Sequence, residues 1–126
     1  MKKTAVIGVL HKDGKLLAEK RHMNEKYFPG SIQFPGGVVE TYDKDNEEAL
    51  RREMKEELGV DILSFRKLHD FVYDDGVEGH VYLIDEYNGI PEALEGEAIL
   101  WVEDEDVLSQ RIDKVIFRKA NDFLSE

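Results

Sequence analysis

The sequence predicts an α/β sandwich with a mixed β-sheet, and three observations carry this prediction. Short runs of apolar and β-branched residues alternate with turn signals through most of the chain. Two other segments have the composition or the spacing of helices, one in the middle of the chain and one at its end. The strands are therefore interleaved with helices, which is typical of layered α/β domains.

The chain begins with a predicted β-hairpin. Residues 4–10 are apolar and β-branched, and Lys12-Asp13-Gly14 is a turn signal. Residues 15–21 return to an apolar pattern and form the second predicted strand. From residue 22 to residue 33 the periodicity disappears, so we expect a loop there.

The segment between this loop and the first helix is short and rich in glycine. It begins with Phe34-Pro35-Gly36-Gly37, continues with a short predicted strand at Val38-Val39, and ends in a polar turn over residues 41–46. Glycines in this position let the backbone approach a ligand closely.

The clearest helix covers residues 46–58. It contains good helix formers and neither glycine nor a β-branched residue. Asp45 or Asn46 is suited to cap its start, and Gly59 is suited to end it in a left-handed conformation.

The second half of the chain completes the sheet and adds a second helix. Residues 62–73 and 80–87 predict a second hairpin, and residues 98–102 predict a further strand. Residues 103–106 open a turn or a short helix. The last segment has apolar residues at helical spacing and predicts a helix that packs on the domain: Ile112, Ile116, Ala120 and Phe123.

Length and composition indicate one domain over residues 1–126, because a chain of this size with 41% hydrophobic residues has room for one core. The absence of cysteine excludes disulfides, thiolate nucleophiles and sulfur-ligated metals, so a bound metal would have oxygen or histidine ligands. No apolar run is long enough to span a bilayer, and a removable leader would destroy the first strand. We therefore expect a cytoplasmic location.

The formal net charge of −11 argues against a nucleic-acid polymer as partner, because that affinity comes largely from clustered lysine and arginine. A small phosphorylated substrate remains compatible with this charge, since divalent cations bound to an acidic cluster reverse the local field. We expect small-molecule partners and no membrane.

Three carboxylates lie on one face of the predicted helix 46–58. Glu53, Glu56 and Glu57 are related by i, i+3 and i+4, and oxygen-only clusters of this kind suit Mg²⁺ or Mn²⁺. Charged helices whose glutamates pair with arginine and lysine have the same composition. The context favours the metal site, because Gly37 lies upstream in a turn where it can offer its carbonyl oxygen.

This segment resembles the signature of the Nudix (MutT-like) hydrolase family, Gly-x5-Glu-x7-Arg-Glu-U-x-Glu-Glu-x-Gly-U, where U is aliphatic. Residues 52–60, Arg-Glu-Met-Lys-Glu-Glu-Leu-Gly-Val, match its second half at every specified position. The first half departs: Asp43 stands where the signature has glutamate, and the interval to Arg52 is one residue longer. We interpret this as an insertion before the helix, which leaves the role of Asp43 as a partner for Arg52 open.

The resemblance implies a Nudix-type α/β/α sandwich and a Mg²⁺- or Mn²⁺-dependent hydrolase. It implies that Glu53, Glu56 and Glu57 ligate the metal together with the Gly37 carbonyl, and that Arg52 positions Glu53. For the general base it leaves three choices open: a glutamate of the signature, Glu95 or Glu97, of which we favour Glu97.

Substrate contacts are expected outside the signature. Arg21, at the end of the first hairpin, is suited to bind a phosphate. Tyr27, Phe28 or Phe34 is suited to stack on a base, and Phe34 is the one we select. A calcium-binding EF-hand loop starting at Asp43 is excluded, because Glu48 and Met54 stand where that loop needs glycine and glutamate.

Two functions remain. The first is a diphosphohydrolase that cleaves the diphosphate linkage of a nucleoside diphosphate derivative, with an NTP or a modified dNTP favoured over ADP-ribose or a nucleotide sugar. The second is a non-catalytic nucleotide-binding module of the same fold, motivated by the irregular turn between Gly37 and Arg52. A homodimer is compatible with either function, and the sequence does not identify the substrate.

Overall fold

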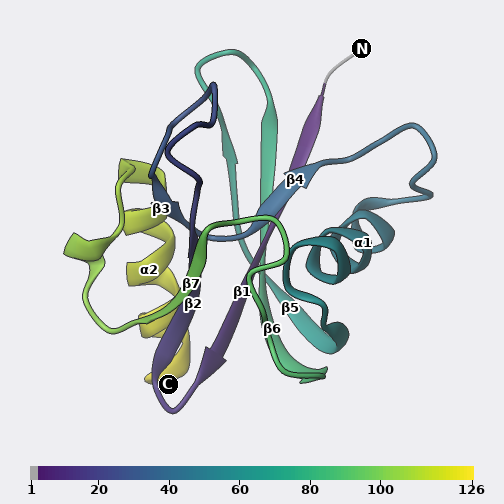
Figure 1. The fold of residues 1–126 in the computed structure, drawn as a ribbon. Helices are drawn as coiled ribbons and strands as arrows, with labels where there is room; N and C mark the ends of the chain where they lie inside the picture. Colours follow the sequence, from purple (N-terminus) through teal and green to yellow (C-terminus); the bar gives the residue numbers. More distant parts are fainter. Residues whose placement is uncertain (1–2) are drawn as a thin grey trace.

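The computed structural model describes residues 3–126, which form a seven-stranded sheet with a helix on each face (Figure 1). The central strand order is β3-β2-β1-β6-β5, with β4 paired to β1 and β7 paired to β2. The strands are β1 (Thr4–Lys12), β2 (Lys15–Lys20), β3 (Ile32–Gln33), β4 (Gly36–Val38), β5 (Asp61–Val72), β6 (Glu78–Asn88) and β7 (Ala98–Val102).

The sheet is mixed, as predicted. Strand β1 runs parallel to β6 and antiparallel to β2 and β4. The β1–β2 hairpin pairs only next to its turn, at His11 with Leu16 and Lys12 with Lys15. Beyond these pairs the two strands separate, and β4 pairs with β1 while β3 and β7 pair with β2. The connection from β3 to β4 crosses this opening, where Gly8 N donates to Pro35 O at 2.9 Å.

Two apolar layers form on opposite faces of the sheet. Helix α1 (Asn46–Leu58) covers one face, where Leu50, Met54 and Leu58 pack against residues of β1, β2 and β6. Helix α2 (Arg111–Leu124) covers the other face with Ile116, Phe117 and Ala120. The α/β/α sandwich with a mixed sheet that was predicted from the sequence is therefore confirmed.

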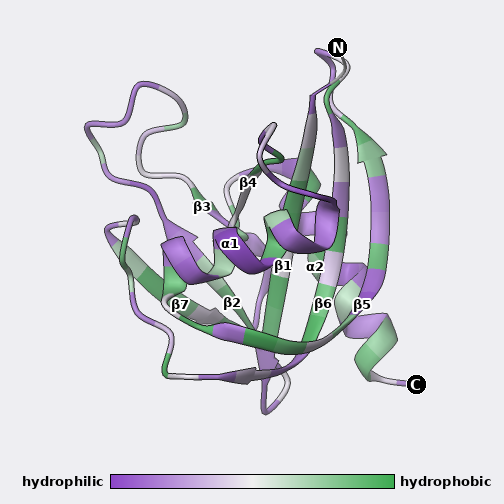
Figure 2. Ribbon diagram, turned by 90° about the vertical axis from the view of Figure 1, so that its right-hand side faces the viewer, coloured by the Kyte–Doolittle hydropathy of each residue, from purple (hydrophilic) through white to green (hydrophobic). Residues whose placement is uncertain are grey.

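Helix α1 packs unusually close to the sheet at Gly8. A Cβ atom on Gly8 would lie 2.6 Å from the Met54 sulfur and 2.8 Å from Ile84 Cδ1. The outer face of the helix is hydrophilic, and hydrophobic residues lie on the strands behind it (Figure 2). This packing fixes the height of α1 above the sheet, and with it the position of the carboxylates.

The helix ends agree with the sequence analysis. The Asp45 carboxylate accepts a hydrogen bond from Glu48 N and caps the start of α1, while Gly59 ends it at a φ of 74° and donates its N–H to Lys55 O. The turn or short helix expected after β7 is a 3-10 helix, η1 (Glu105–Val107). No helix within residues 3–126 is long and apolar enough to cross a membrane.

Candidate active site

The three carboxylates of α1 lie at the boundary between the core and the surface. Glu53 and Glu57 are buried, whereas Glu56 is exposed. The apolar side of the helix draws the first two inward, because Met54 and Leu58 are fully buried beside them. The packing of these apolar neighbours therefore keeps two carboxyl groups buried.

Arg52 is bound to several carboxylates at once. Its Nε and Nη2 atoms donate to the two oxygens of Asp43 at 3.0 and 2.7 Å, and Nη1 donates to Glu53 Oε1 at 2.9 Å and Glu56 Oε2 at 3.2 Å. The bidentate geometry gives both orientation and strength. The Arg52 guanidinium holds the pKa of Asp43 below its usual range.

The one-residue insertion before α1 therefore leaves the arginine clamp intact. The polar turn brings Asp43 to Arg52 although the signature has glutamate there, and Asp43 Oδ2 also accepts from Glu40 N at 2.8 Å. A shorter side chain on a longer turn thus reaches the same guanidinium.

Gly37 touches the Glu53 carboxylate. A Cβ atom at this position would lie 2.3 Å from Glu53 Oε1 and 2.4 Å from its carboxyl carbon. Only glycine leaves room for this contact, which places the backbone of β4 against the carboxylate face of α1.

Glu19 is a fourth carboxylate of the site and was missed by the sequence analysis. It lies on β2 and is 5% exposed. Its side chain is within hydrogen-bonding reach of Glu57, and we term these two residues the acidic pair. The Oε2 atoms of Glu19 and Glu57 are buried and have no hydrogen-bond partner within residues 3–126. The available signal was its place two residues after Leu17, which puts both side chains on one face of the strand.

The loop over residues 89–97 brings Glu95 to the cluster. Backbone N–H groups of Glu92 and Leu94 donate to the carbonyls of Leu58 and Glu57 at 3.0 and 3.1 Å, so the loop is bound to the end of α1. Burial raises the pKa of Glu19, Glu53 and Glu57, and the charge of Glu95 adds to each shift.

Glu97, which the sequence analysis favoured as general base, is bound to a lysine. Its carboxylate forms an ion pair with Lys20 Nζ at 3.0 Å. Of the two loop glutamates, Glu95 is thus the one whose charge acts on the carboxylates of α1.

The donor set fits a hard divalent cation, because it consists of oxygens only and two of them are buried without a partner in the described chain. Among the described residues, no three histidine, cysteine, aspartate or glutamate side chains already have the arrangement of metal ligands. Glu53 and Glu56 are each turned toward Arg52. Cation binding would thus require the Glu53 and Glu56 side chains to rotate.

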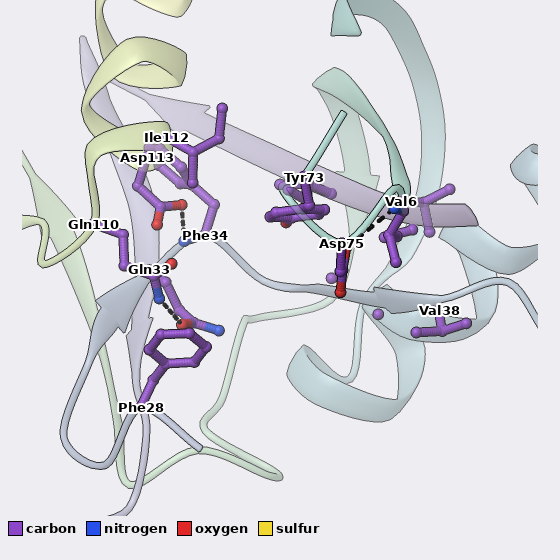
Figure 3. A pocket seen from close by; sticks show the side chains of 15 residues that line it. Val6, Phe28, Gln33, Phe34, Val38, Tyr73, Asp75, Gln110, Ile112 and Asp113 are labelled. Atoms are coloured by element: carbon purple, nitrogen blue, oxygen red, sulfur yellow. Dashed lines mark hydrogen bonds between the residues drawn. The ribbon is translucent and has the colours of Figure 1, made fainter. Parts of the chain in front are cut away.

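A pocket of about 380 Å³ opens on the other face of the sheet, between β4 and the start of α2 (Figure 3). Gly37 lines this pocket as well as touching Glu53. Phe28 and Phe34 supply aromatic rings to its wall. Its dimensions are those of a small-ligand site.

One end of the pocket is polar. Asp113 Oδ1 accepts from Phe34 N at 3.2 Å, and Gln110 Nε2 donates to Gln33 Oε1 at 3.2 Å (Figure 3). Burial raises the pKa of Asp113 to about 6. The sequence analysis missed this residue, although it shares one face of the final helix with Ile116, Phe117 and Ala120.

The two substrate-binding residues predicted from the sequence differ in their surroundings. Phe34 is buried and lines the pocket. Arg21 instead donates to Tyr27 O at 3.0 Å and to Glu25 Oε2 at 2.9 Å, so it holds the loop over residues 22–31. In this loop Phe28 has a φ of 50°, a rare conformation for a bulky residue, and its exposed ring lies at the pocket.

Comparison with known proteins identifies relatives of this architecture. A sequence model of the NUDIX domain matches residues 1–120. The chain is 34% identical over 79 residues to an 8-oxo-dGTP diphosphatase of Haemophilus influenzae, covering 60% of this chain and 57% of that protein. It is 29% identical over 110 residues to a CTP pyrophosphohydrolase of Escherichia coli, covering 82% and 77%.

A third curated relative is the nucleoside triphosphatase NudI of Salmonella agona, which is 36% identical over 90 residues. That match covers 65% of this chain and 63% of the relative. The matches to the diphosphatase and to NudI thus span less than two thirds of those proteins.

Solved structures share the fold. A MutT NUDIX hydrolase from Burkholderia pseudomallei superposes with a TM-score of 0.81 at 25% identity, covering 94% of this chain and 98% of that one. A MutT structure from work on Aliivibrio salmonicida and Vibrio cholerae superposes with a TM-score of 0.80 at 24% identity, covering 98% and 100%.

Proposed function

This chain belongs to the Nudix (MutT-like) hydrolase family, and from that premise we propose that it hydrolyses a phosphoanhydride bond of a nucleoside triphosphate with Mg²⁺ or Mn²⁺. The observation that carries the proposal is the position of Gly37. Its backbone lines the aromatic pocket and also contacts the carboxylate of Glu53. A ligand whose ring occupies the pocket would thus direct its phosphates toward the carboxylates of α1.

The names of the curated relatives support a nucleoside triphosphate as substrate. They describe enzymes that act on 8-oxo-dGTP, on CTP and on nucleoside triphosphates. The pocket supports the same class, since its aromatic wall suits a flat base and its polar end suits the hydrogen-bonding edge of that base. ADP-ribose and nucleotide sugars remain the alternatives that a substrate panel has to compare.

Glu53, Glu56 and Glu57, with the Gly37 carbonyl, would hold the cation. When bound, the cation neutralises charge on the diphosphate and lowers the pKa of water. Arg52 keeps Glu53 and Glu56 oriented through its two hydrogen bonds, and Asp43 in turn fixes the guanidinium. Arg52 and Asp43 thus fix the positions of Glu53 and Glu56 in the free protein, from which side-chain rotation would bring their oxygens to the cation.

Glu95 is the general base in this proposal. A water oxygen forms the new bond to phosphorus, the bridging P–O bond breaks, and the Glu95 carboxylate takes the proton. Its loop is held to the end of α1 by backbone hydrogen bonds to Glu57 and Leu58, so the carboxylate is positioned by the same helix that holds the cation.

The non-catalytic alternative loses the observation that motivated it. The turn between Gly37 and Arg52 is longer than the family signature, but it delivers Asp43 to Arg52 in bidentate geometry. No other feature of the described residues favours a binding-only function.

The test is release of phosphate and pyrophosphate from a panel of NTPs, oxidised dNTPs, ADP-ribose, dinucleotides and nucleotide sugars with Mg²⁺ or Mn²⁺. We expect turnover of at least one nucleoside triphosphate. A double variant, Glu56→Gln with Glu57→Gln, should be folded and inactive. Glu103→Gln is the matched control, because that glutamate is exposed and its nearest described partner is Lys15 at 3.7 Å.

Two results would contradict the proposal. Unchanged turnover in the double variant would remove the α1 carboxylates from the mechanism. Tight nucleotide binding in Mn²⁺ without any product would instead establish the non-catalytic module.

A further inference from the structure

We propose that Glu19 is a further ligand of the divalent cation, supplied by the sheet and shared with Glu57. The inference rests on the proposed function in one respect, since it takes the carboxylates of α1 to bind a cation. The family signature covers only β4, the turn and α1, so it assigns no role to a residue of β2.

The first step is the position of Glu19 on its strand. Leu17 and Glu19 lie on the face of β2 that α1 covers, and Leu17 belongs to the apolar layer there. Glu19 is 5% exposed in the same layer. A carboxylate in apolar surroundings costs free energy unless a cation or hydrogen-bond donors compensate it.

The second step is the lack of such compensation. The Oε2 atoms of both members of the acidic pair are buried and lack a hydrogen-bond partner in residues 3–126. Burial raises the pKa of Glu57 most, and the charge of Glu19 comes next. The charges of Glu53 and Glu95, which are also negative, raise it further. Glu95 also raises the pKa of Glu19, and the charge of Arg21 lowers it in part, without a hydrogen bond to the pair.

The third step is that nearby cationic side chains are already engaged. Arg52 is bound to Asp43 and the outer glutamates of α1. Lys20, next to Glu19 in sequence, forms its ion pair with Glu97 at 3.0 Å. Arg21 is bound to Glu25 and to the Tyr27 carbonyl. None of these three side chains donates a hydrogen bond to the acidic pair, which leaves its Oε2 atoms available to a cation from solution.

The fourth step is the way the chain encloses Glu19. A Cβ atom on Gly96 would lie 3.5 Å from Glu19 Oε2 and 3.0 Å from Lys20 O, so the loop backbone passes directly beside the carboxylate. Three segments thus converge on the acidic pair: β2, α1 and the loop over residues 89–97. Oxygen ligands drawn from separate segments are the usual construction of a hard-cation site.

The competing explanation is that Glu19 and Glu57 only share a proton and support the fold. The two explanations differ in what Glu19→Gln does. A ligand role predicts weaker cation binding and unimpaired folding without metal. A proton-sharing role predicts unchanged cation binding and lower stability.

The experiment measures Mn²⁺ binding by calorimetry on the full chain, without nucleotide, for wild type, Glu19→Gln and the control Glu103→Gln. We expect Glu19→Gln to raise the Kd for Mn²⁺ by about tenfold or more. Its thermal midpoint in EDTA should equal or exceed that of wild type, and the rise on adding Mn²⁺ should shrink. A Kd within about twofold of wild type would overturn the proposal.

A second measurement needs no substitution and covers the case in which Glu19→Gln does not fold. In wild-type protein with ¹³C-labelled glutamate carboxyl groups, substoichiometric Mn²⁺ should broaden the Glu19 signal together with that of Glu57. The Glu103 signal should stay sharp. Broadening of Glu57 without Glu19 would overturn the inference and leave the proposed function standing, whereas wild type that binds no Mn²⁺ would overturn both.

Discussion

Arg52 and the acidic pair lie at opposite sides of the same carboxylate face of α1. Around Arg52, the Asp43 and Glu53 carboxylates share one guanidinium, and each of its nitrogens donates a hydrogen bond. At the acidic pair, Glu57 faces Glu19, and the described chain offers their Oε2 atoms neither a cation nor a donor. The fold compensates the first group of charges and leaves the second without a partner among the described residues.

Arg52 thus serves to orient carboxylates, whereas the acidic pair serves to attract a cation. The clamp at Arg52 is complete without any ligand, so it can orient Glu53 and Glu56 in the free protein. The acidic pair is unfavourable in the free protein and becomes favourable only when its charge is neutralised. Substitutions at the two sides should therefore change stability in opposite directions.

The largest expected effect is the loss of activity in Glu57→Gln. Loss of a cation ligand should reduce the stabilisation of the transition state by several kcal/mol and thus lower kcat by about 10³-fold. The thermal midpoint in EDTA should stay equal or rise, because the repulsion with Glu19 disappears. Turnover assays and thermal unfolding check the two parts, and kcat within about tenfold of wild type would contradict the assignment.

Arg52→Gln tests the other side of the comparison. The substitution leaves the Asp43 carboxylate shielded from solvent and without its cationic partner. It should therefore lower the free energy of unfolding by about 2–3 kcal/mol. Activity should fall by about 10–100-fold, since the arginine only orients ligands. Urea denaturation measures the first quantity, and unaltered stability would mean that the clamp contributes nothing to the fold.

Asp113 provides a buried carboxyl with one donor, intermediate between the two sides. Its pKa is raised by burial from 3.8 to about 6. A raised folded-state pKa means that this group stabilises the fold below about pH 4, and that this contribution is lost as the pH rises to about 6. Asp113→Asn, which keeps an acceptor for Phe34 N, should lack this dependence.

The measurement for Asp113 is the difference in unfolding free energy between wild type and Asp113→Asn at several pH values. Relative to the variant, wild type should lose about 2 kcal/mol between about pH 4 and about pH 7. A difference that does not vary with pH would show that Asp113 titrates normally.

The smallest expected effect is at Glu97. Its ion pair with Lys20 is partly exposed, so Glu97→Gln should change the unfolding free energy by less than about 1 kcal/mol. Glu95→Gln should lower kcat by about 10²-fold or more, as expected for a general base. Parallel kcat measurements compare the two, and a larger loss in Glu97→Gln would restore the preference drawn from the sequence.

Helix α1 was predictable from sequence because its signals are local. Asp45 at its start and Gly59 at its end act through neighbouring backbone groups, so the boundaries 46–58 were correct. Most strands followed from alternation and turn residues, but β3 (Ile32–Gln33) lies in the segment that was expected to be a loop. The mixed sheet and the two helical layers are confirmed.

The rest of the site depends on which distant residues meet across the fold. Glu19 is a single acidic residue in an apolar strand, and only the packing of α1 on β2 shows that it faces Glu57. The preference between Glu95 and Glu97 depends on how the loop is bound to the end of α1. Asp113 lies in the apolar stripe of its helix, and a charged residue there was the available signal. That Asp113 lies at the pocket could be recognised only from the position of β4 beside the final helix.

The closed ends of the loop over residues 22–31 affect how such a protein can change over evolutionary time. The loop joins β2 to β3, and its ends are joined by the hydrogen bond from Arg21 N to Ser31 O at 2.9 Å. Its interior can therefore vary in length and sequence without moving the strands that carry Glu19 and Gly37. On the proposed function, the pocket residue Phe28 thus lies on a different stretch of chain from Glu19 and the carboxylates of α1, so the loop can be altered while those carboxylates are retained.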